Sequence, residues 1–289
     1  MADGNSFSKT YQMDPNPVPA MDWYSYVNRA KEEWTNLLNS EAGCNERNIH
    51  QFLAAHPSFL PGAGRGSFPI ALISEPPLAG IGRKIPDFVW LASDSLNFSP
   101  VLIEIESPCK SWFTQAGVPH HDLTQAINQL AEWAAWLNRP ENILIFQEHF
   151  QVPDYLRRTR RFRPRFILIY GRRQEFQNKP ELIRLRAQFE HDNQEAMTFD
   201  RLEPSEQDSI YISVSKTRER YQALAVPATF QLSPMIASEL SLIEGIPDAI
   251  RANDWINEQR KKFLIERLAY WNNWSRRKPQ GILNTGDWE

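Results

Sequence analysis

The chain has 289 residues, of which 42% are hydrophobic and 23% charged, and its formal net charge at pH 7 is −3. This composition is typical of a folded globular protein, and it lacks the overall basicity that usually marks a nucleic-acid-binding protein. No apolar run reaches the roughly 20 residues needed to cross a bilayer, and the N-terminus has neither a basic start nor a hydrophobic stretch. We therefore expect a cytoplasmic protein.

Cysteine usage indicates a reduced protein. The chain has only Cys44 and Cys109, which are too few for a disulfide framework and show no zinc-type spacing with histidine. We expect both thiols to be free and to serve as packing residues.

The first elements in chain order are two helices and three strands. Residues 1–20 lack periodicity and predict a loosely ordered arm. Apolar residues at helical spacing predict a helix from Trp23 to Leu38, and Asn45 is the expected N-cap of a second helix that ends at His56. Strands are expected at 68–74, 85–92 and 100–106.

The rest of the chain continues to alternate helices and strands. We expect a helix at 122–137, strands at 143–146 and 162–172, a charged helix at 174–191, and two short strands in IYISVSK and YQALAVP. Residues 234–274 are predicted to be almost wholly helical, with a break near Gly245. This alternation predicts an α/β fold with a mixed central sheet flanked by helices and a C-terminal helical extension.

The character of the chain changes beyond about Ser205, which predicts three segments. These are an N-terminal arm and helix at 1–39, a core at 40–205, and a strand pair with a helical extension at 206–289. The final helix interleaves aromatic and basic residues. Such a helix can bind nucleic acid or a second subunit. Alternatively, its apolar stripe packs on the core and its basic face lies in water, which is the commoner arrangement.

Three carboxylates in or beside apolar strands are the main functional signal. Asp87 opens the strand FVWLA, and Glu104 and Glu106 lie on one side of the run VLIEIES because strand residues alternate faces. A hairpin between the two strands would bring all three carboxylates together. Buried carboxylates need a partner, and Mg²⁺ is the obvious candidate. The alternative is an ordinary solvent-exposed polar face of an antiparallel strand.

A run of arginines offers a second signal. The segment RRTRRFRPR, residues 157–165, contains six arginines, and guanidinium groups match phosphate oxygens. Arg157, Arg158, Arg160 and Arg161 are our candidate DNA-binding residues. A solvated loop or an interface with an acidic neighbour explains the same residues equally well.

Several segments together resemble a known nuclease family. They are NERNIHQFLAAHPSFL, KIPDFVWL, VLIEIESPCKSWFTQAGVPHHDLTQAINQLAEWAAWL, RFILIYGR and MTFDRL, which span roughly residues 40–205. Their order is similar to the PD-(D/E)XK nuclease core, and the wider chain resembles the Shedu family of anti-phage defence proteins. The resemblance implies a restriction-endonuclease-like core at 40–205.

Carried onto this sequence, the resemblance implies that Asp87 and Glu104 are metal ligands. Glu46 matches the additional acid that an N-terminal helix often contributes, although a first-turn glutamate is also favoured by the helix dipole alone. Gln129 corresponds to a glutamine often found near the reacting phosphate, and Gln125, one turn earlier, is the alternative. The implied cofactor is Mg²⁺, with Mn²⁺ as a substitute.

The sequence departs from the family pattern at one position. Glu106 stands where a lysine is expected, so it would act as a metal ligand or general base, and Lys110 is the candidate to restore the positive charge. The pair His120 and His121, just before the glutamine helix, is more typical of caps or surface residues than of a catalytic site.

These observations predict a metal-dependent DNA endonuclease of an anti-phage defence system. The resemblance also implies assembly into dimers or tetramers. The substitution at Glu106 leaves a second hypothesis open, a catalytically silent sensor or scaffold that keeps the nuclease fold. A nuclease acting on RNA is a third and weaker possibility, because the chemistry of phosphodiester hydrolysis does not distinguish ribose from deoxyribose.

Overall fold

A single mixed sheet organises the molecule. The computed structural model describes residues 8–64, 66–77, 85–217, 219–279 and 281–289. Within these residues nine strands form one sheet in the order β6-β5-β3-β2-β1-β7-β8-β9, and β4 pairs with β3. The strands are β1 (Ala71–Ser74), β2 (Phe88–Ser93), β3 (Asn97–Ile105), β4 (Arg161–Phe162), β5 (Arg165–Ile169), β6 (Gln194–Met197), β7 (Ile212–Lys216), β8 (Tyr221–Ala225) and β9 (Ile243–Glu244).

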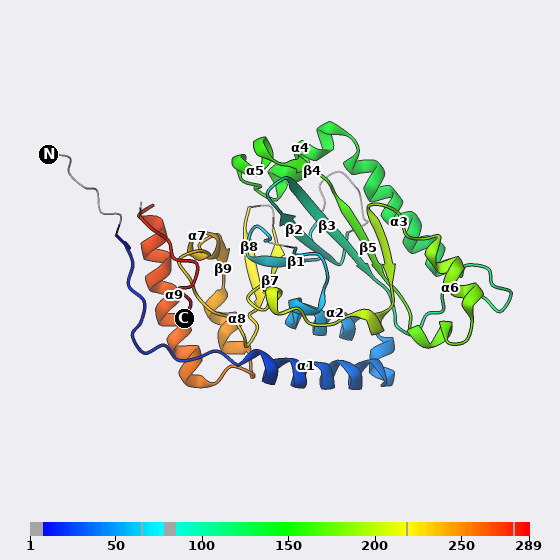
Figure 1. Cartoon of the computed structure of the whole chain (residues 1–289), viewed down its shortest axis with the longest axis horizontal. Coiled ribbons are helices and arrows are strands. Elements are labelled where there is room, and N and C mark those ends of the chain that lie inside the picture. Colours follow the sequence, from blue (N-terminus) through cyan, green and yellow to red (C-terminus); the bar gives the residue numbers. More distant parts are fainter. Residues whose placement is uncertain (1–7, 65, 78–84, 218, 280) are drawn as a thin grey trace.

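Helices surround this sheet (Figure 1). Figure 1 shows α3 and α6 at one end of the molecule, α1 and α2 along one side, and α7, α8 and α9 at the other end. The helices are α1 (Trp23–Leu38), α2 (Glu46–Ala55), α3 (His121–Leu137), α4 (Pro140–His149), α5 (Asp154–Thr159), α6 (Pro180–Ala187), α7 (Ala237–Leu240), α8 (Ile246–Ala252) and α9 (Glu258–Arg276). The fold is therefore mixed α/β, as predicted.

The predicted hairpin is confirmed and lies at the centre of the sheet. Strands β2 and β3 are antiparallel, with Phe88 opposite Ile103. The turn forms because the Asp94 carboxylate accepts hydrogen bonds from the backbone N–H groups of Leu96 and Asn97, at 2.6 and 2.7 Å. Both strands are almost entirely buried, so the hairpin holds the site residues on a rigid support.

One predicted strand is wrong and one predicted helix is shortened. Residues 143–146 lie inside α4, not in a strand. A short apolar run does not distinguish the two by periodicity, and Pro140 at the first helical position favours the helix. The charged helix expected at 174–191 is reduced to a 3₁₀ turn (Arg173–Phe176) followed by α6, which also begins at a proline.

The C-terminal segment continues the same sheet. Strand β7 pairs with β1 in parallel, from Ala71 opposite Ile212 to Ser74 opposite Ser215. Strand β8 follows β7 as an antiparallel neighbour, and α8 packs on β8. The boundary near residue 205 stays a prediction, and backbone hydrogen bonds cross it. Residues 1–7 of the expected N-terminal arm lie outside the described part of the chain. No described helix is long and apolar enough to span a membrane.

Buried His56 gives the fold a pH-dependent stability. His56 is 8% exposed, and its Nδ1 lies 3.0 Å from the Tyr26 hydroxyl. Burial, helped by the charge of Arg29, lowers the pKa of His56 to about 4. The unfolded chain therefore binds this proton more tightly than the folded one. The contribution is fully present above about pH 6.5 and is lost as the pH falls toward 4.

We expect this loss to amount to about 3 kcal/mol of unfolding free energy. Urea unfolding at pH 7.5 and pH 4 of the wild type and of His56→Gln isolates it, because other titrating groups act on both proteins. The stability advantage of the wild type should shrink by about that amount at the lower pH. An advantage that does not change with pH would contradict the assignment.

Candidate active site

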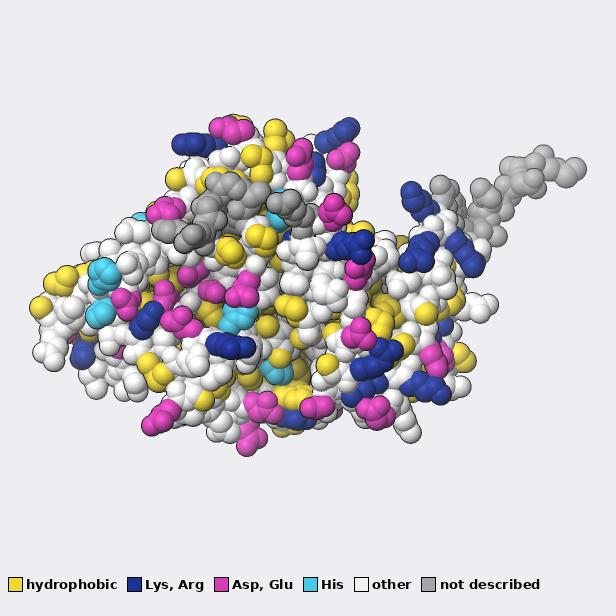
Figure 2. Space-filling model, turned by 180° about the vertical axis from the view of Figure 1, so that it is seen from behind, with side chains coloured by type: hydrophobic (Ala, Val, Ile, Leu, Met, Phe, Trp, Pro, Cys, Tyr) yellow, Lys and Arg dark blue, Asp and Glu magenta, His cyan; other side chains and the backbone are white. Residues whose placement is uncertain are grey.

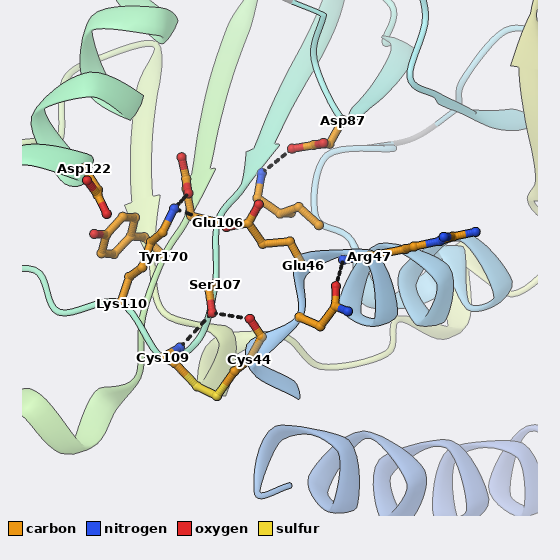
Figure 3. A network of polar contacts seen from close by, with 12 residues as sticks. Cys44, Glu46, Arg47, Asp87, Glu106, Ser107, Cys109, Lys110, Asp122 and Tyr170 are labelled. Carbon is orange, nitrogen blue, oxygen red and sulfur yellow. Dashed lines mark hydrogen bonds and ion pairs between the residues drawn. A yellow bond between two sulfur atoms is a disulfide. The ribbon is translucent and has the colours of Figure 1, made fainter. Parts of the chain in front are cut away.

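Asp87 is fixed at the end of the central hairpin. It directly precedes β2, and one of its carboxylate oxygens, Oδ2, accepts a hydrogen bond of 2.8 Å from the backbone N–H of Ile105 (Figure 3). Burial raises the pKa of Asp87; the Ile105 hydrogen bond opposes the rise, and the charge of Glu75 adds to it. The structure thus places Asp87 beside the end of β3, next to Glu104.

Glu104 is half-buried and incompletely satisfied. Among the residues that the structure describes, its buried Oε2 has no hydrogen-bond partner. Burial, followed by the charge of Asp87, raises the pKa of Glu104, and a hydrogen bond from the Gln129 side chain opposes the rise. A buried carboxylate oxygen without a partner needs either a proton or a cation. The arrangement therefore fits a divalent ion bound between Asp87 and Glu104.

Lys110 turns back toward the site. Its ammonium group hydrogen-bonds the Glu106 carboxylate and lies 3.1 Å from an oxygen of Glu46. Burial lowers the pKa of Lys110, but the hydrogen bonds and negative charges of Glu106 and Glu46 outweigh it, so that the pKa is raised overall. Lys110 is therefore a fixed cation beside Glu106, which stands where the family pattern has its lysine.

Acidic and basic side chains are unevenly distributed over the surface. On the face that Figure 2 shows, Asp and Glu side chains gather toward the end that carries α3, whereas most Lys and Arg side chains lie toward the α9 end. A polyanion approaching the carboxylates would be repelled unless a cation neutralised them.

Of the three expected metal ligands, Asp87 and Glu104 lie together, and Glu46 does not join them. Within the described residues, which include Glu46, Asp87 and Glu104, no group of three or more His, Cys, Asp or Glu side chains is close enough to hold an ion. Glu46 is directed to Lys110 instead. Because Mg²⁺ is usually held by one or two carboxylates and retains several waters, Asp87 and Glu104 alone are a suitable donor set.

The prediction of two free thiols is wrong. Cys44 and Cys109 form a disulfide with a Cα–Cα distance of 5.3 Å, within the usual range for such a bond. A sequence separation of 65 residues gives no local signal, and only the fold brings the pair together. The Ser107 hydroxyl adds a 2.9 Å hydrogen bond to the Cys44 carbonyl (Figure 3). The start of α2 is thus tied to the loop that follows β3.

Sequence reasoning missed three residues around the site. Glu75 follows β1, and its backbone N–H donates to the Asp87 carbonyl at 2.8 Å. The His50 ring stacks on Phe88 with its centroid 4.4 Å away. The Glu175 carboxylate accepts the backbone N–H groups of Trp112 and Phe113, both at 2.9 Å, and so fixes the loop that carries Lys110. Glu75 could have been found from the sequence, because it is an acidic residue at the end of a predicted strand. Nothing in the sequence near Glu175 indicates its role.

The arginine segment lies far from the carboxylates. Arg161 pairs with Asn97 at the beginning of β3, while Glu104 lies near its end. Seven residues of strand separate the two ends by ~23 Å. Arg157 also differs from its neighbours, because its guanidinium donates to the carbonyls of Val152 and Gln147 at 2.7 and 2.8 Å. It is engaged in holding α5, whereas Arg158 and Arg161 are exposed.

The predicted histidine pair lies at the beginning of α3. His120 is the N-cap residue and donates its backbone N–H to the Trp112 carbonyl at 2.8 Å. His121 is exposed beside Asp122, with 3.4 Å between Nδ1 and the nearer carboxylate oxygen. Gln129 on the same helix reaches Glu104, whereas Gln125 is exposed.

Fold and site together define a mixed α/β protein with paired carboxylates at the end of a central hairpin. A family model described as the C-terminal part of the Shedu protein SduA matches residues 43–202, which is more than half of the chain. The chain therefore belongs to the Shedu SduA family, an anti-phage defence nuclease family. A search of curated proteins found no match.

Proposed function

We propose that the protein is a metal-dependent DNA endonuclease with a PD-(D/E)XK core. The observation that carries the proposal is the proximity of Asp87, which is hydrogen-bonded to Ile105, and Glu104, whose buried Oε2 has no partner within the described part of the chain. The family membership supports the same reaction class. When bound, Mg²⁺ or Mn²⁺ would neutralise charge developing on the phosphodiester and activate a water molecule.

The side chains have separable roles in this proposal. Asp87 and Glu104 hold the ion, and Gln129 orients Glu104 through its hydrogen bond. Lys110 offers its cation to a phosphate oxygen, and the Glu106 carboxylate holds the Lys110 side chain in place. Glu106 and Lys110 together thus replace the single lysine of the family pattern. Glu46, which contacts Lys110, steadies the same cation.

DNA is the proposed substrate, and the arginine segment is its second point of contact. Because Arg161 lies ~23 Å from Glu104 along β3, and a duplex rises 3.4 Å per base pair, Arg161 would meet the backbone about seven base pairs from the reacting phosphate. Assembly into a dimer or tetramer remains a prediction.

Removing two exposed arginines should weaken the dependence of DNA binding on salt. We expect Arg158→Ala with Arg161→Ala to reduce the slope of log K against log salt by about two units, one for each phosphate that is no longer neutralised. Filter binding of a 30-base-pair duplex across a salt series, with Ca²⁺ in place of Mg²⁺, measures the slope.

Arg251→Ala is the matched control, since Arg251 is an exposed arginine on α8 that pairs with Asp248. It should leave the slope unchanged. An unaltered slope in the double variant would remove the arginine segment from the DNA interface. The double variant should still nick a short duplex, because its carboxylate site is unchanged, and this nicking tests the carboxylate site independently of the arginines.

A further inference from the structure

The disulfide between Cys44 and Cys109 is open to solvent. Both cysteines are exposed, although the bond links two segments that are 65 residues apart in sequence. Cys44 is the last residue of a 3₁₀ turn, and α2 begins two residues later at Glu46. Cys109 lies in the loop after β3, immediately before Lys110. The bond therefore joins the two segments that carry the Glu46–Lys110 ion pair (Figure 3).

A cavity lies beside Cys109. It has a volume of about 320 Å³, and its lining includes Pro108, Cys109, Lys110, Ser111, Arg172 and Glu175. Glu175 is occupied by its two backbone N–H donors. Lys110 is paired with Glu106 and Glu46, and Arg172 is paired with Asp200, so the cavity does not select a small thiol by its charge.

We propose that Cys44–Cys109 is a thiol–disulfide exchange site that sets how firmly the first turn of α2, with Glu46, is held against Lys110. Solvent-exposed disulfides are the ones that exchange with small thiols, whereas structural ones resist them. Any effect on DNA cleavage rests on the nuclease function proposed above; the exchange itself does not.

The exchange balances with two equivalents of a small thiol. A thiolate attacks Sγ of Cys109, the S–S bond breaks, and Cys44 leaves as a thiolate that takes up a proton. A second small thiolate attacks the outer sulfur of the mixed disulfide and releases Cys109, which is protonated in turn. The two small thiols supply both electrons and leave as their own disulfide.

Reduction loosens the first turn of α2 without detaching the helix. Ile49 and Leu53 keep α2 packed in the core, because both are fully buried. Once the disulfide is reduced, two contacts still join the start of α2 to the loop after β3. They are the hydrogen bond from Ser107 to the Cys44 carbonyl and the ion pair of Lys110 with Glu46. The Glu46 side chain is 49% exposed, so this ion pair is weak on its own. The oxidised form is the one in which Glu46 and Lys110 are held together.

Hydrogen exchange of the native full-length protein tests the inference. After treatment with reduced glutathione, mass spectrometry should first find the mixed disulfide on Cys109, without denaturant. Amides in peptides covering residues 44–50 should then exchange about tenfold faster than in the oxidised protein, as expected for a locally opened segment. Peptides from α9 provide an internal reference and should not change.

The double variant Cys44→Ala with Cys109→Ala is the matched control. Its residues 44–50 should exchange like those of the reduced wild type, with or without glutathione. Equal exchange in the oxidised and reduced wild type would overturn the proposal, and so would a bond that glutathione fails to open in the native protein.

Nicking of plasmid DNA by the same samples separates this inference from the nuclease function. The oxidised wild type should cut about tenfold faster than the reduced form, the scale of effect that groups supporting a metal site produce. If exchange rates differ but neither form cuts DNA, the exchange site stands and the nuclease proposal fails. If both forms cut equally and exchange equally, the nuclease proposal stands and the exchange site fails.

Discussion

Asp87→Asn should lower the rate of Mg²⁺-dependent DNA nicking about a thousandfold, the upper range for losing one preorganised electrostatic group. Asparagine keeps an oxygen that accepts the hydrogen bond from Ile105 N–H, so the hairpin end should retain its shape. What disappears is the negative charge that would share the ion with Glu104. Plasmid nicking under single-turnover conditions measures the loss.

Two controls distinguish the loss of the Asp87 charge from a loss of folding. Asp248→Asn removes an exposed carboxylate on α8 that pairs with Arg251, and it should cut DNA at the wild-type rate. Mn²⁺ titration followed by calorimetry should show tight binding to the wild type and to Asp248→Asn but not to Asp87→Asn. A wild-type protein that binds Mn²⁺ yet never nicks any form of DNA would instead favour the silent sensor.

Arg260→Met should lower the free energy of unfolding by about 3–5 kcal/mol. Arg260 is only 2% exposed, and burial lowers its pKa to about 10. Its guanidinium donates to the carbonyls of Val18, Phe230 and Glu289, which joins the N-terminal segment and the end of the chain to α9. Methionine fills similar volume but removes the donor from the carbonyls of Val18 and Phe230, whereas the Glu289 carbonyl keeps the backbone N–H of Leu232.

Urea unfolding at pH 7.5 measures this effect. Arg251→Met is the comparison, because its arginine is exposed and makes one ion pair with a neighbour on its own helix. Its change should stay within about 0.5 kcal/mol. If Arg260→Met costs less than about 1 kcal/mol, the buried guanidinium does not hold the segments together.

The sequence predicted the central hairpin and its acids because their signals are local. Alternation along VLIEIES and a polar turn are enough to place Asp87 beside the end of β3. The helix that carries Gln129 was equally visible from its apolar stripe, and the Gln129 side chain, which the family resemblance singled out, does reach Glu104.

Other features depend on contacts between distant segments and had no local signal. The Cys44–Cys109 bond spans 65 residues. A parallel pair such as β1 with β7 is not joined by a short turn, so the sequence has no turn motif that would predict it. Lys110 was a candidate from the sequence, but the loop that returns it to Glu106 is anchored by the distant residue Glu175. The helix at 140–149 was missed because its apolar run ILIF is as short as a strand.

Strand β7 has a practical consequence for anyone who wishes to isolate the family-matched segment. A protein cut after residue 202 would lose β7, and the backbone of β1 from Ala71 to Ser74 would become an open sheet edge. Unprotected edges recruit strands from other molecules, so such a fragment should precipitate or swap strands during purification. Expression of the site therefore calls for the chain through at least β8.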